Sequence, residues 1–332
     1  MTVDALAFWV REPGVGELRP VRLPRPGPDD VVVRTMYSGI SRGTEALVFR
    51  GGVPKRERVT MRAPFQDGEF PGPVKYGYLN VGVVESGPEQ LLDRVVFCLY
   101  PHQTRYVVPA SAVTPVPTDV PARRAVLAGT VETAVNALWD AAPRIGDRVS
   151  VVGAGMVGCC VARLLTGIPG ASVTLVDVNT ERARTAADLG VAFATPDDAP
   201  DEQDIVLHAS ATAAGLQRGL DSLAVEGVLV ELSWYGDSQV SVSLGGAFHS
   251  RRLALRASQV GAVAADRRVR RSSGDRLALA MKLLQDSAFD TLITGASAFA
   301  ELPTVMEKVT DGSVPALCHV ITYDDASHSC SA

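Results

Sequence analysis

A glycine-rich turn between two apolar runs carries the clearest chemistry in this sequence. Residues 149–152 form a short β-branched run that leads directly into the turn, and a small-residue helical pattern follows it. The first glycine of such a strand–turn–helix unit permits a tight turn, the second lets a pyrophosphate approach the backbone, and the third allows close helix–strand contact. The helix N-terminus directs free N–H groups at the phosphates. The residues that we expect to bind a dinucleotide here are Gly153, Gly155, Met156, Val157 and Gly158.

An acidic residue follows at the distance that dinucleotide binding requires. Asp177 ends the next apolar run, residues 172–176, about twenty residues after the glycines. A carboxylate at this position bonds the adenosine ribose hydroxyls and repels a 2′-phosphate, so the sequence predicts NAD(H) as the preferred cofactor. Arg182 is a basic residue near this position that leaves NADP(H) as the less favoured alternative.

Composition narrows the class of protein. The chain has 332 residues, 46% of them hydrophobic and 21% charged, which is ordinary for a globular protein of two domains. A net charge of −5 argues against a nucleic-acid binder, and we interpret the basic cluster at residues 267–271 as a solvated surface. No apolar run is long enough for a signal peptide or a membrane span, so we expect a cytoplasmic protein that binds neither nucleic acid nor membrane. The five cysteines lack CxxC spacing and are expected to be reduced thiols.

The chain divides by pattern into two kinds of segment. Residues 1–125 contain short β-branched runs separated by Pro- and Gly-rich turns, which predicts an irregular β unit, and residues 266–332 are expected to return to it. Residues 126–265 alternate apolar runs with helical patterns, which predicts an α/β domain with a doubly wound parallel sheet. The last eight residues are expected to fray.

Four motifs together resemble the medium-chain dehydrogenase/reductase superfamily over nearly the whole chain. They are SGISRGTE at residues 38–45, KYGYLNVGVVE at 75–85, ETAVNAL at 132–138 and GDRVSVVGAGMVG at 146–158. The resemblance implies a GroES-like β-rich catalytic domain and a Rossmann dinucleotide-binding domain, with the active site between them. It also implies a homodimer joined through the edges of the Rossmann sheets.

The sequence departs from the zinc-dependent members of this superfamily at the metal ligands. Ser41 stands at the first cysteine ligand, Tyr78 at the histidine, Leu79 at the adjacent glutamate and Gly129 at the last cysteine. Hydroxyl oxygens are poor Zn²⁺ ligands beside Cys and His, so we expect no catalytic zinc and assign no metal ligands. The four-cysteine loop that binds a structural zinc is absent as well. Within the superfamily, the sequence most resembles the zinc-lacking clade that includes bacteriochlorophyllide a 2-hydroxyethyl dehydrogenase.

Without zinc, hydrogen-bond donors must protonate the substrate oxygen and stabilise an alkoxide. Tyr78 is a candidate acid if a basic neighbour such as Lys75 lowers its pKa, although an aromatic residue that only packs is an equal alternative. The resemblance places Thr44 where family members keep a hydroxyl that bonds the substrate oxygen. Ser41 and Glu45 flank Thr44, and Glu45 could instead cap the helix or pair with Arg42.

Further candidates lie elsewhere in the chain. His102 could end a proton relay, because imidazole is a common proton carrier, but a structural role is the more common one for such a histidine. The resemblance places Thr133 at the nicotinamide. Other residues end strands at the same sheet edge and are candidates for contact with the cofactor, namely His208, Ser210, Thr212, Ser233 and Trp234.

The sequence therefore predicts a zinc-independent, NAD(H)-dependent oxidoreductase that interconverts a secondary alcohol and a ketone. The small-molecule substrate could carry the reacting group on the side chain of a larger ring. Two alternatives remain, a quinone or enoyl reductase and a non-catalytic NAD(H)-binding module.

Overall fold

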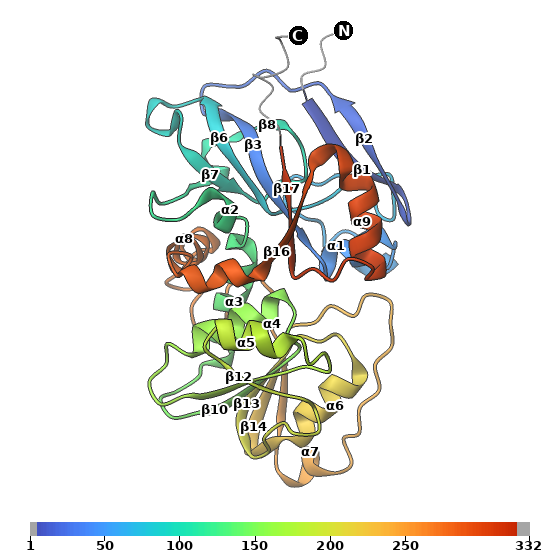
Figure 1. The fold of residues 1–332 in the computed structure, drawn as a ribbon, viewed down its shortest axis with the longest axis vertical. Helices are drawn as coiled ribbons and strands as arrows, with labels where there is room; N and C mark the ends of the chain where they lie inside the picture. The colour runs from blue at the N-terminus through green and yellow to red at the C-terminus, as the bar shows by residue number, and fades with distance from the viewer. Residues whose placement is uncertain (1–4, 324–332) are drawn as a thin grey trace. The chain divides into compact units, whose positions relative to one another are not determined.

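The chain folds into two compact units. The computed structural model describes residues 5–323, and the expectation for the last eight residues lies outside this range. The first unit comprises Met1–Gly129 and Ile293–Ala332, and the second comprises Thr130–Leu292. Figure 1 shows a β-rich first unit and a mixed α/β second unit. The predicted fold class is confirmed.

A six-stranded parallel sheet organises the second unit. Its order is β12-β11-β10-β13-β14-β15, and every neighbouring pair is parallel. The strands are β10 (Arg148–Val152), β11 (Ser172–Val176), β12 (Ala192–Ala194), β13 (Gln203–His208), β14 (Leu223–Glu231) and β15 (Ala254–Ala257). The helices are α3 (Ala128–Ala141), α4 (Met156–Leu165), α5 (Arg182–Asp188), α6 (Ala213–Asp221), α7 (Ala247–Ser250) and α8 (Ser273–Leu283). From β10 the strands are added first on one side of the sheet, as β11 and β12, and then on the other side, as β13, β14 and β15. Ligands of doubly wound sheets bind at such a switch point, between β10 and β13, at the carboxyl ends of the strands.

The apolar runs form these strands because the sheet buries both of its faces. Val149, Val151 and Leu207 are fully buried, and α4 and α6 both contact β10. A parallel strand covered on both sides needs apolar residues throughout rather than an alternating pattern. The carboxyl ends of β10 and β13 are therefore held rigidly, and the turns that follow them are the natural place for a site.

Two further sheets build the first unit. One has the order β2-β1-β5-β4, and the other has the order β16-β17-β3-β6-β7-β9 with β8 also paired to β3. The strands are β1 (Ala5–Glu12), β2 (Val15–Val21), β3 (Asp30–Ser41), β4 (Asp67–Gly68), β5 (Val74–Lys75), β6 (Asn80–Ser86), β7 (Val95–Cys98), β8 (Arg105–Pro109), β9 (Val113–Pro115), β16 (Ile293–Ala298) and β17 (Cys318–Thr322). The helices are α1 (Thr44–Phe49), α2 (Ala122–Ala125) and α9 (Leu302–Asp311). The C-terminal strand β17 pairs antiparallel with β3, so the end of the chain returns to the first unit.

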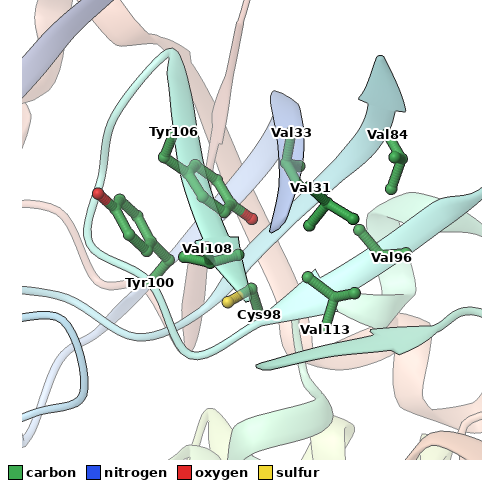
Figure 2. Close-up of a cluster of buried hydrophobic side chains, with 9 residues drawn as sticks. All are labelled: Val31, Val33, Val84, Val96, Cys98, Tyr100, Tyr106, Val108 and Val113. Atoms are coloured by element: carbon green, nitrogen blue, oxygen red, sulfur yellow. The ribbon is translucent and has the colours of Figure 1, made fainter. Parts of the chain in front are cut away.

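A hydrophobic cluster fills part of the first unit (Figure 2). The rings of Tyr100 and Tyr106 stack with their centroids 3.9 Å apart, and valines from several strands surround Tyr106. The members are Val31, Val33, Val84, Val96, Cys98, Tyr100, Tyr106, Val108 and Val113. This packing holds β3, β7 and β8, and so fixes both ends of the segment that carries His102.

The sequence pattern placed the second boundary between the units after residue 265. In the structure this boundary lies later, after Leu292. Arg276 in α8 forms a buried ion pair with Glu132 in α3, with Nε and Oε1 3.0 Å apart. Arg163 in α4 pairs with Asp286 beyond α8. The amphipathic pattern of α8 revealed a helix but not its partner, and these charge pairs attach residues 266–292 to the second unit.

We predict that Glu132→Gln destabilises the protein by about 3 kcal/mol, because it leaves the buried Arg276 guanidinium without a carboxylate partner. Chemical denaturation of the purified variant measures the change. The matched control is Glu202→Gln, since the ion pair of Glu202 with Arg251 is exposed and contributes about 0–1 kcal/mol. Equal stabilities of the two variants would contradict the prediction.

Candidate active site

The glycine turn follows β10 in the second unit. Gly153 has a φ of +109°, which favours glycine, and a Cβ on Gly153 would lie 2.6 Å from the backbone nitrogen of Ser210. A Cβ on Gly158 would lie 1.9 Å from the carbonyl oxygen of Gly153, so the helix packs directly on the turn. Gly155 precedes α4 and has open space around its Cβ direction. The turn thus exposes backbone at the N-terminus of a ten-residue helix, an arrangement that fits a pyrophosphate.

Asp177 braces this turn as well as following the second strand. One oxygen of its carboxylate accepts a hydrogen bond from the N–H of Ala154 at 2.7 Å, and the other accepts from the N–H of Asn179 at 2.8 Å. The side chain is partly exposed at the carboxyl end of β11. Arg182 begins α5 a few residues later. These positions fit an adenosine ribose beside the turn.

A second polar cluster occupies the carboxyl ends of β13 and β14. His208 and Glu231 lie opposite each other in the parallel register, and His208 Nδ1 is 2.8 Å from Glu231 Oε2. His208 Nε2 is 2.7 Å from the hydroxyl of Ser210. Glu231 also accepts hydrogen bonds from the N–H of Ser233 at 2.7 Å and the hydroxyl of Tyr235 at 2.9 Å. A buried imidazole therefore joins a carboxylate to a hydroxyl at the turn.

In the first unit, three hydroxyl groups meet where β3 ends and α1 begins. Tyr78 forms side-chain hydrogen bonds with Ser41 and Thr44, and all three residues are partly exposed. Burial and then the nearby Glu45 carboxylate raise the pKa of Tyr78 to about 12, against the opposing effect of the two hydrogen bonds. Tyr78 is thus a protonated donor at every physiological pH.

A buried carboxylate and imidazole lie behind the hydroxyls. Glu45 Oε2 is 2.8 Å from His102 Nε2, and both side chains are almost fully buried. The other oxygen of Glu45 accepts from the N–H of Ser41 at 2.9 Å. His102 Nδ1 is 2.6 Å from the hydroxyl of Ser38, which is 2.8 Å from the hydroxyl of Tyr323. The interpretation of Glu45 as a cap or as a partner of Arg42 misses its role as the partner of His102.

Lys75 does not act on Tyr78 as the sequence suggested. Its ammonium group donates to the side-chain oxygen of Gln103 at 3.1 Å and lies 5.4 Å from the centre of the Tyr100 ring. Burial lowers the pKa of Lys75, while Asp67 opposes the shift. The expectation that Lys75 lowers the pKa of Tyr78 is wrong, because the ammonium group is engaged by Gln103, and burial and Glu45 raise the pKa of Tyr78.

The remaining candidates for cofactor contact all belong to the second unit. Ser233 accepts the N–H of Ala211 at 3.0 Å, which ties together the loops after β13 and β14. Trp234 follows Ser233 and is partly exposed, and Thr133 lies partly exposed in α3. Met156 and Val157 begin α4 as expected. The structure brings Ser210 and Ser233 into the cluster around His208.

The side chains at the positions that the resemblance assigns to zinc ligands do not fit zinc. Gly129 supplies no side chain, and a Cβ there would lie 2.7 Å from a methyl carbon of Leu79, which fills the space. The hydroxyls of Ser41 and Tyr78 are engaged with each other and with Thr44 rather than converging as thiolate and imidazole ligands do. Within residues 5–323 no group of three or more His, Cys, Asp or Glu side chains could hold a metal ion. We therefore assign no step to a metal.

Sequence reasoning missed four members of these networks. Ser38 and Tyr323 come from paired strands far apart in the chain, and Gln103 becomes visible only through its contact with Lys75. Glu231 could have been found, since it ends a strand next to the one that His208 ends. Polar residues at the ends of two neighbouring buried strands are the signal that indicates such a pair.

Comparison with known proteins supports the fold and the resemblance. No family model matches the chain. The sequence is 28% identical over 233 residues to 2-desacetyl-2-hydroxyethyl bacteriochlorophyllide A dehydrogenase of Cereibacter sphaeroides. The alignment covers 63% of this chain and 66% of the relative, which is just under two thirds of its length. No helix in the described part of the chain has the length and apolar character needed to cross a membrane.

Two solved structures cover almost all of the chain. A putative zinc-binding dehydrogenase from Sinorhizobium meliloti 1021 bound to NADP aligns with a TM-score of 0.75 at 16% identity, over 96% of this chain and 99% of the other. A short chain alcohol dehydrogenase from Escherichia coli CFT073 complexed with NADH aligns with a TM-score of 0.77 at 16% identity, over 97% and 100%. The fold with its β-rich and α/β units is shared with these dehydrogenases, and the resemblance of the chain to the medium-chain dehydrogenase/reductase superfamily is confirmed.

Proposed function

We propose that this protein is a zinc-independent oxidoreductase that uses NAD(H) to interconvert a secondary alcohol and a ketone. The observation that carries the proposal is the hydroxyl cluster of Ser41, Thr44 and Tyr78. The resemblance to zinc-dependent dehydrogenases assigns two of its members, Ser41 and Tyr78, to positions of metal ligands. A cluster of donors suits an oxygen that becomes an alkoxide. The activated alkene of an enoyl or quinone reductase depends on such donors less, because hydride addition to a conjugated C=C bond gives a delocalised enolate rather than a localised alkoxide.

The second unit supplies the features that support NAD(H) binding. The open backbone at Gly155 and the helix N-terminus suit the pyrophosphate, and Asp177 beside them suits an unphosphorylated adenosine ribose. A carboxylate repels a 2′-phosphate, which favours NAD(H) over NADP(H). The nicotinamide ring of the bound cofactor supplies or accepts the hydride.

Residues of the first unit would donate the proton that the substrate oxygen receives. With a pKa raised to about 12, Tyr78 is a poor base near neutral pH, but it can give its proton to the more basic alkoxide formed when a ketone is reduced. Ser41 and Thr44 hydrogen-bond its oxygen and would stabilise the tyrosinate that results. Glu45 and His102 act behind this cluster, since Glu45 fixes the backbone of Ser41 and His102 fixes Glu45.

The side chain of a larger ring is a reasonable substrate class. The sequence relative acts on a bacteriochlorophyllide, and its match reaches only 66% of its own length. We therefore propose a ketone or secondary alcohol attached to a ring, and leave the ring itself to a substrate screen.

This function predicts turnover by protein freed of metal. After dialysis against a chelator, the enzyme is expected to oxidise NADH with one or more ring-attached methyl ketones, and to use NADPH less efficiently. The matched panel consists of enones and quinones of similar size. Loss of activity on chelation with recovery on adding Zn²⁺ would contradict zinc independence, faster reduction of the enones would favour the alkene reductase, and no turnover of any compound would leave a non-catalytic NAD(H)-binding module.

Removing the phenol of Tyr78 is expected to slow the chemical step. Tyr78→Phe should lower kcat for ketone reduction roughly 100-fold, a typical contribution of a general acid, while NADH affinity stays unchanged. Because the pKa of Tyr78 is about 12, the wild-type rate should not lose this acid as the pH rises through about 10, where an ordinary tyrosine ionises. Tyr37→Phe, also in the first unit, is the control. An unchanged kcat in Tyr78→Phe would remove Tyr78 from the acid role.

We also propose a homodimer that forms through the edge of the parallel sheet. The edge strand β15 has all four residues exposed, including Leu255 at 44%. An exposed edge offers unpaired backbone groups to a second copy, in an isologous pairing. Sedimentation velocity should give a dimer for the wild type and a monomer for Leu255→Lys. Val225→Lys, at another exposed apolar residue of this unit, should remain a dimer, and a monomeric wild type would refute the pairing.

A further inference from the structure

The cluster at the carboxyl ends of β13 and β14 has the arrangement of an activated nucleophile. His208 is fully buried, and one face of its ring stacks beside Tyr235 with the centroids 6.5 Å apart. Its two ring nitrogens contact groups of opposite character, a carboxylate on one side and a hydroxyl on the other. The proton transfer proposed for the dehydrogenase uses none of these three groups.

The carboxylate fixes which nitrogen of His208 carries the proton. Burial opposes ionisation of Glu231, but the hydrogen bond and the charge attraction from His208, with hydrogen bonds from Ser233, outweigh it and lower the pKa of Glu231. An ionised carboxylate only accepts hydrogen bonds, so the Nδ1 of His208, 2.8 Å away, must be the donor. In the neutral imidazole Nε2 is then an acceptor, and it faces the hydroxyl of Ser210.

The hydroxyl of Ser210 is therefore aligned to lose a proton to His208. Ser210 Oγ lies 2.7 Å from Nε2 and 2.9 Å from the hydroxyl of Thr212. The hydroxyl of Thr212 accepts the N–H of Gly215 at 3.1 Å, which leaves its own proton free to be donated to Ser210. Each donor in this series has an acceptor, and the series ends in a base that a carboxylate orients. Nucleophile, base and orienting group in this order are the requirements of covalent catalysis.

The backbone around Ser210 presents the hydroxyl at a strained turn between a strand and a helix. Ala211 has a φ of +54°, a conformation that costs a residue with a Cβ about 1–3 kcal/mol. Ser210 is partly exposed, and residues 211–214 are exposed. The nine-residue helix α6 begins at Ala213, and the N–H groups of its first turn point toward its N-terminal end. A serine on a strand-to-helix turn beside a helix N-terminus is the placement that hydrolases use for their nucleophile, although the flanking glycines of their motif are absent here.

From this geometry we propose that Glu231, His208 and Ser210 form a catalytic triad that cleaves carboxylic esters. The Oγ of Ser210 bonds to the carbonyl carbon of the ester while its proton passes to His208 Nε2. The bond to the leaving alcohol breaks, and His208 returns the proton to that alcohol. Water then attacks the acyl group on Ser210, giving up a proton through His208, and the carboxylic acid leaves with the serine restored.

The triad is independent of the proposed dehydrogenase activity. The hydrolysis needs only ester and water, and all three residues lie in the second unit. Because Ser210 is also a candidate for contact with the cofactor, the assays contain no NAD(H). Failure of the dehydrogenase proposal would leave this one untouched, and the reverse also holds.

Covalent labelling of the wild-type protein is the first test. A fluorophosphonate forms a bond from phosphorus to an activated serine oxygen and releases fluoride. Peptide mass spectrometry is expected to find the label on Ser210, and denaturing the protein beforehand is expected to abolish it. Absence of label on Ser210, or label spread equally over exposed serines such as Ser238, would overturn the proposal without any need for a variant to fold.

Ester cleavage by variants is the second test. 4-Nitrophenyl acetate should give a burst of nitrophenolate with the wild type, no burst with Ser210→Ala, and a burst at least about 100-fold slower with Glu231→Gln, which no longer holds the tautomer of His208. Ser238→Ala is the matched control and should behave as the wild type. Unfolding midpoints show which variants are folded. A burst of wild-type size in a folded Ser210→Ala protein would overturn the triad.

Discussion

A buried carboxylate must receive hydrogen bonds from its surroundings, and Glu45 imposes this constraint on the first unit. Its two oxygens take the N–H of Ser41 and the ring of His102, which in turn contacts Ser38 on β3. These bonds connect the end of β3, the start of α1 and the segment between β7 and β8. The negative charge also raises the pKa of Tyr78, next to burial itself. Glu45 therefore contributes both to the placement of Ser41 and to the raised pKa of Tyr78.

The sequence predicted the second unit well because its signals are local. A buried parallel strand, a glycine turn and a helix occupy consecutive residues, and the turn allows few alternatives: Gly158 has no room for a side chain against Gly153. The boundary at α8 could not be predicted, because it depends on Arg276 meeting Glu132 across 144 residues of chain. The first unit was predicted only as a β-rich whole, since its sheets pair strands from both ends of the sequence.

The contrast between local and long-range contacts also separates the candidate residues that the sequence described well from those that it did not. Ser41 ends β3 and Thr44 begins α1 three residues later, so their closeness is local. Lys75 seemed a natural partner for Tyr78 because it is near in sequence, but Gln103 and the ring of Tyr100 receive its ammonium group. Charge partners that come from distant strands are decided by register, which a single sequence does not reveal.

Each unit contains a histidine whose ring pairs with a glutamate, His102 with Glu45 and His208 with Glu231. The surroundings of the two histidines give them different chemistry. His102 bonds to Ser38, whose hydroxyl is fully buried and continues to Tyr323, so no substrate reaches that hydroxyl. His208 bonds to Ser210, which is partly exposed on a turn whose following residues are all exposed. A nucleophile must reach both its base and its substrate, and only Ser210 meets both conditions. The pair of Glu45 and His102 is therefore suited to positioning, whereas the pair of Glu231 and His208 is suited to activating a hydroxyl.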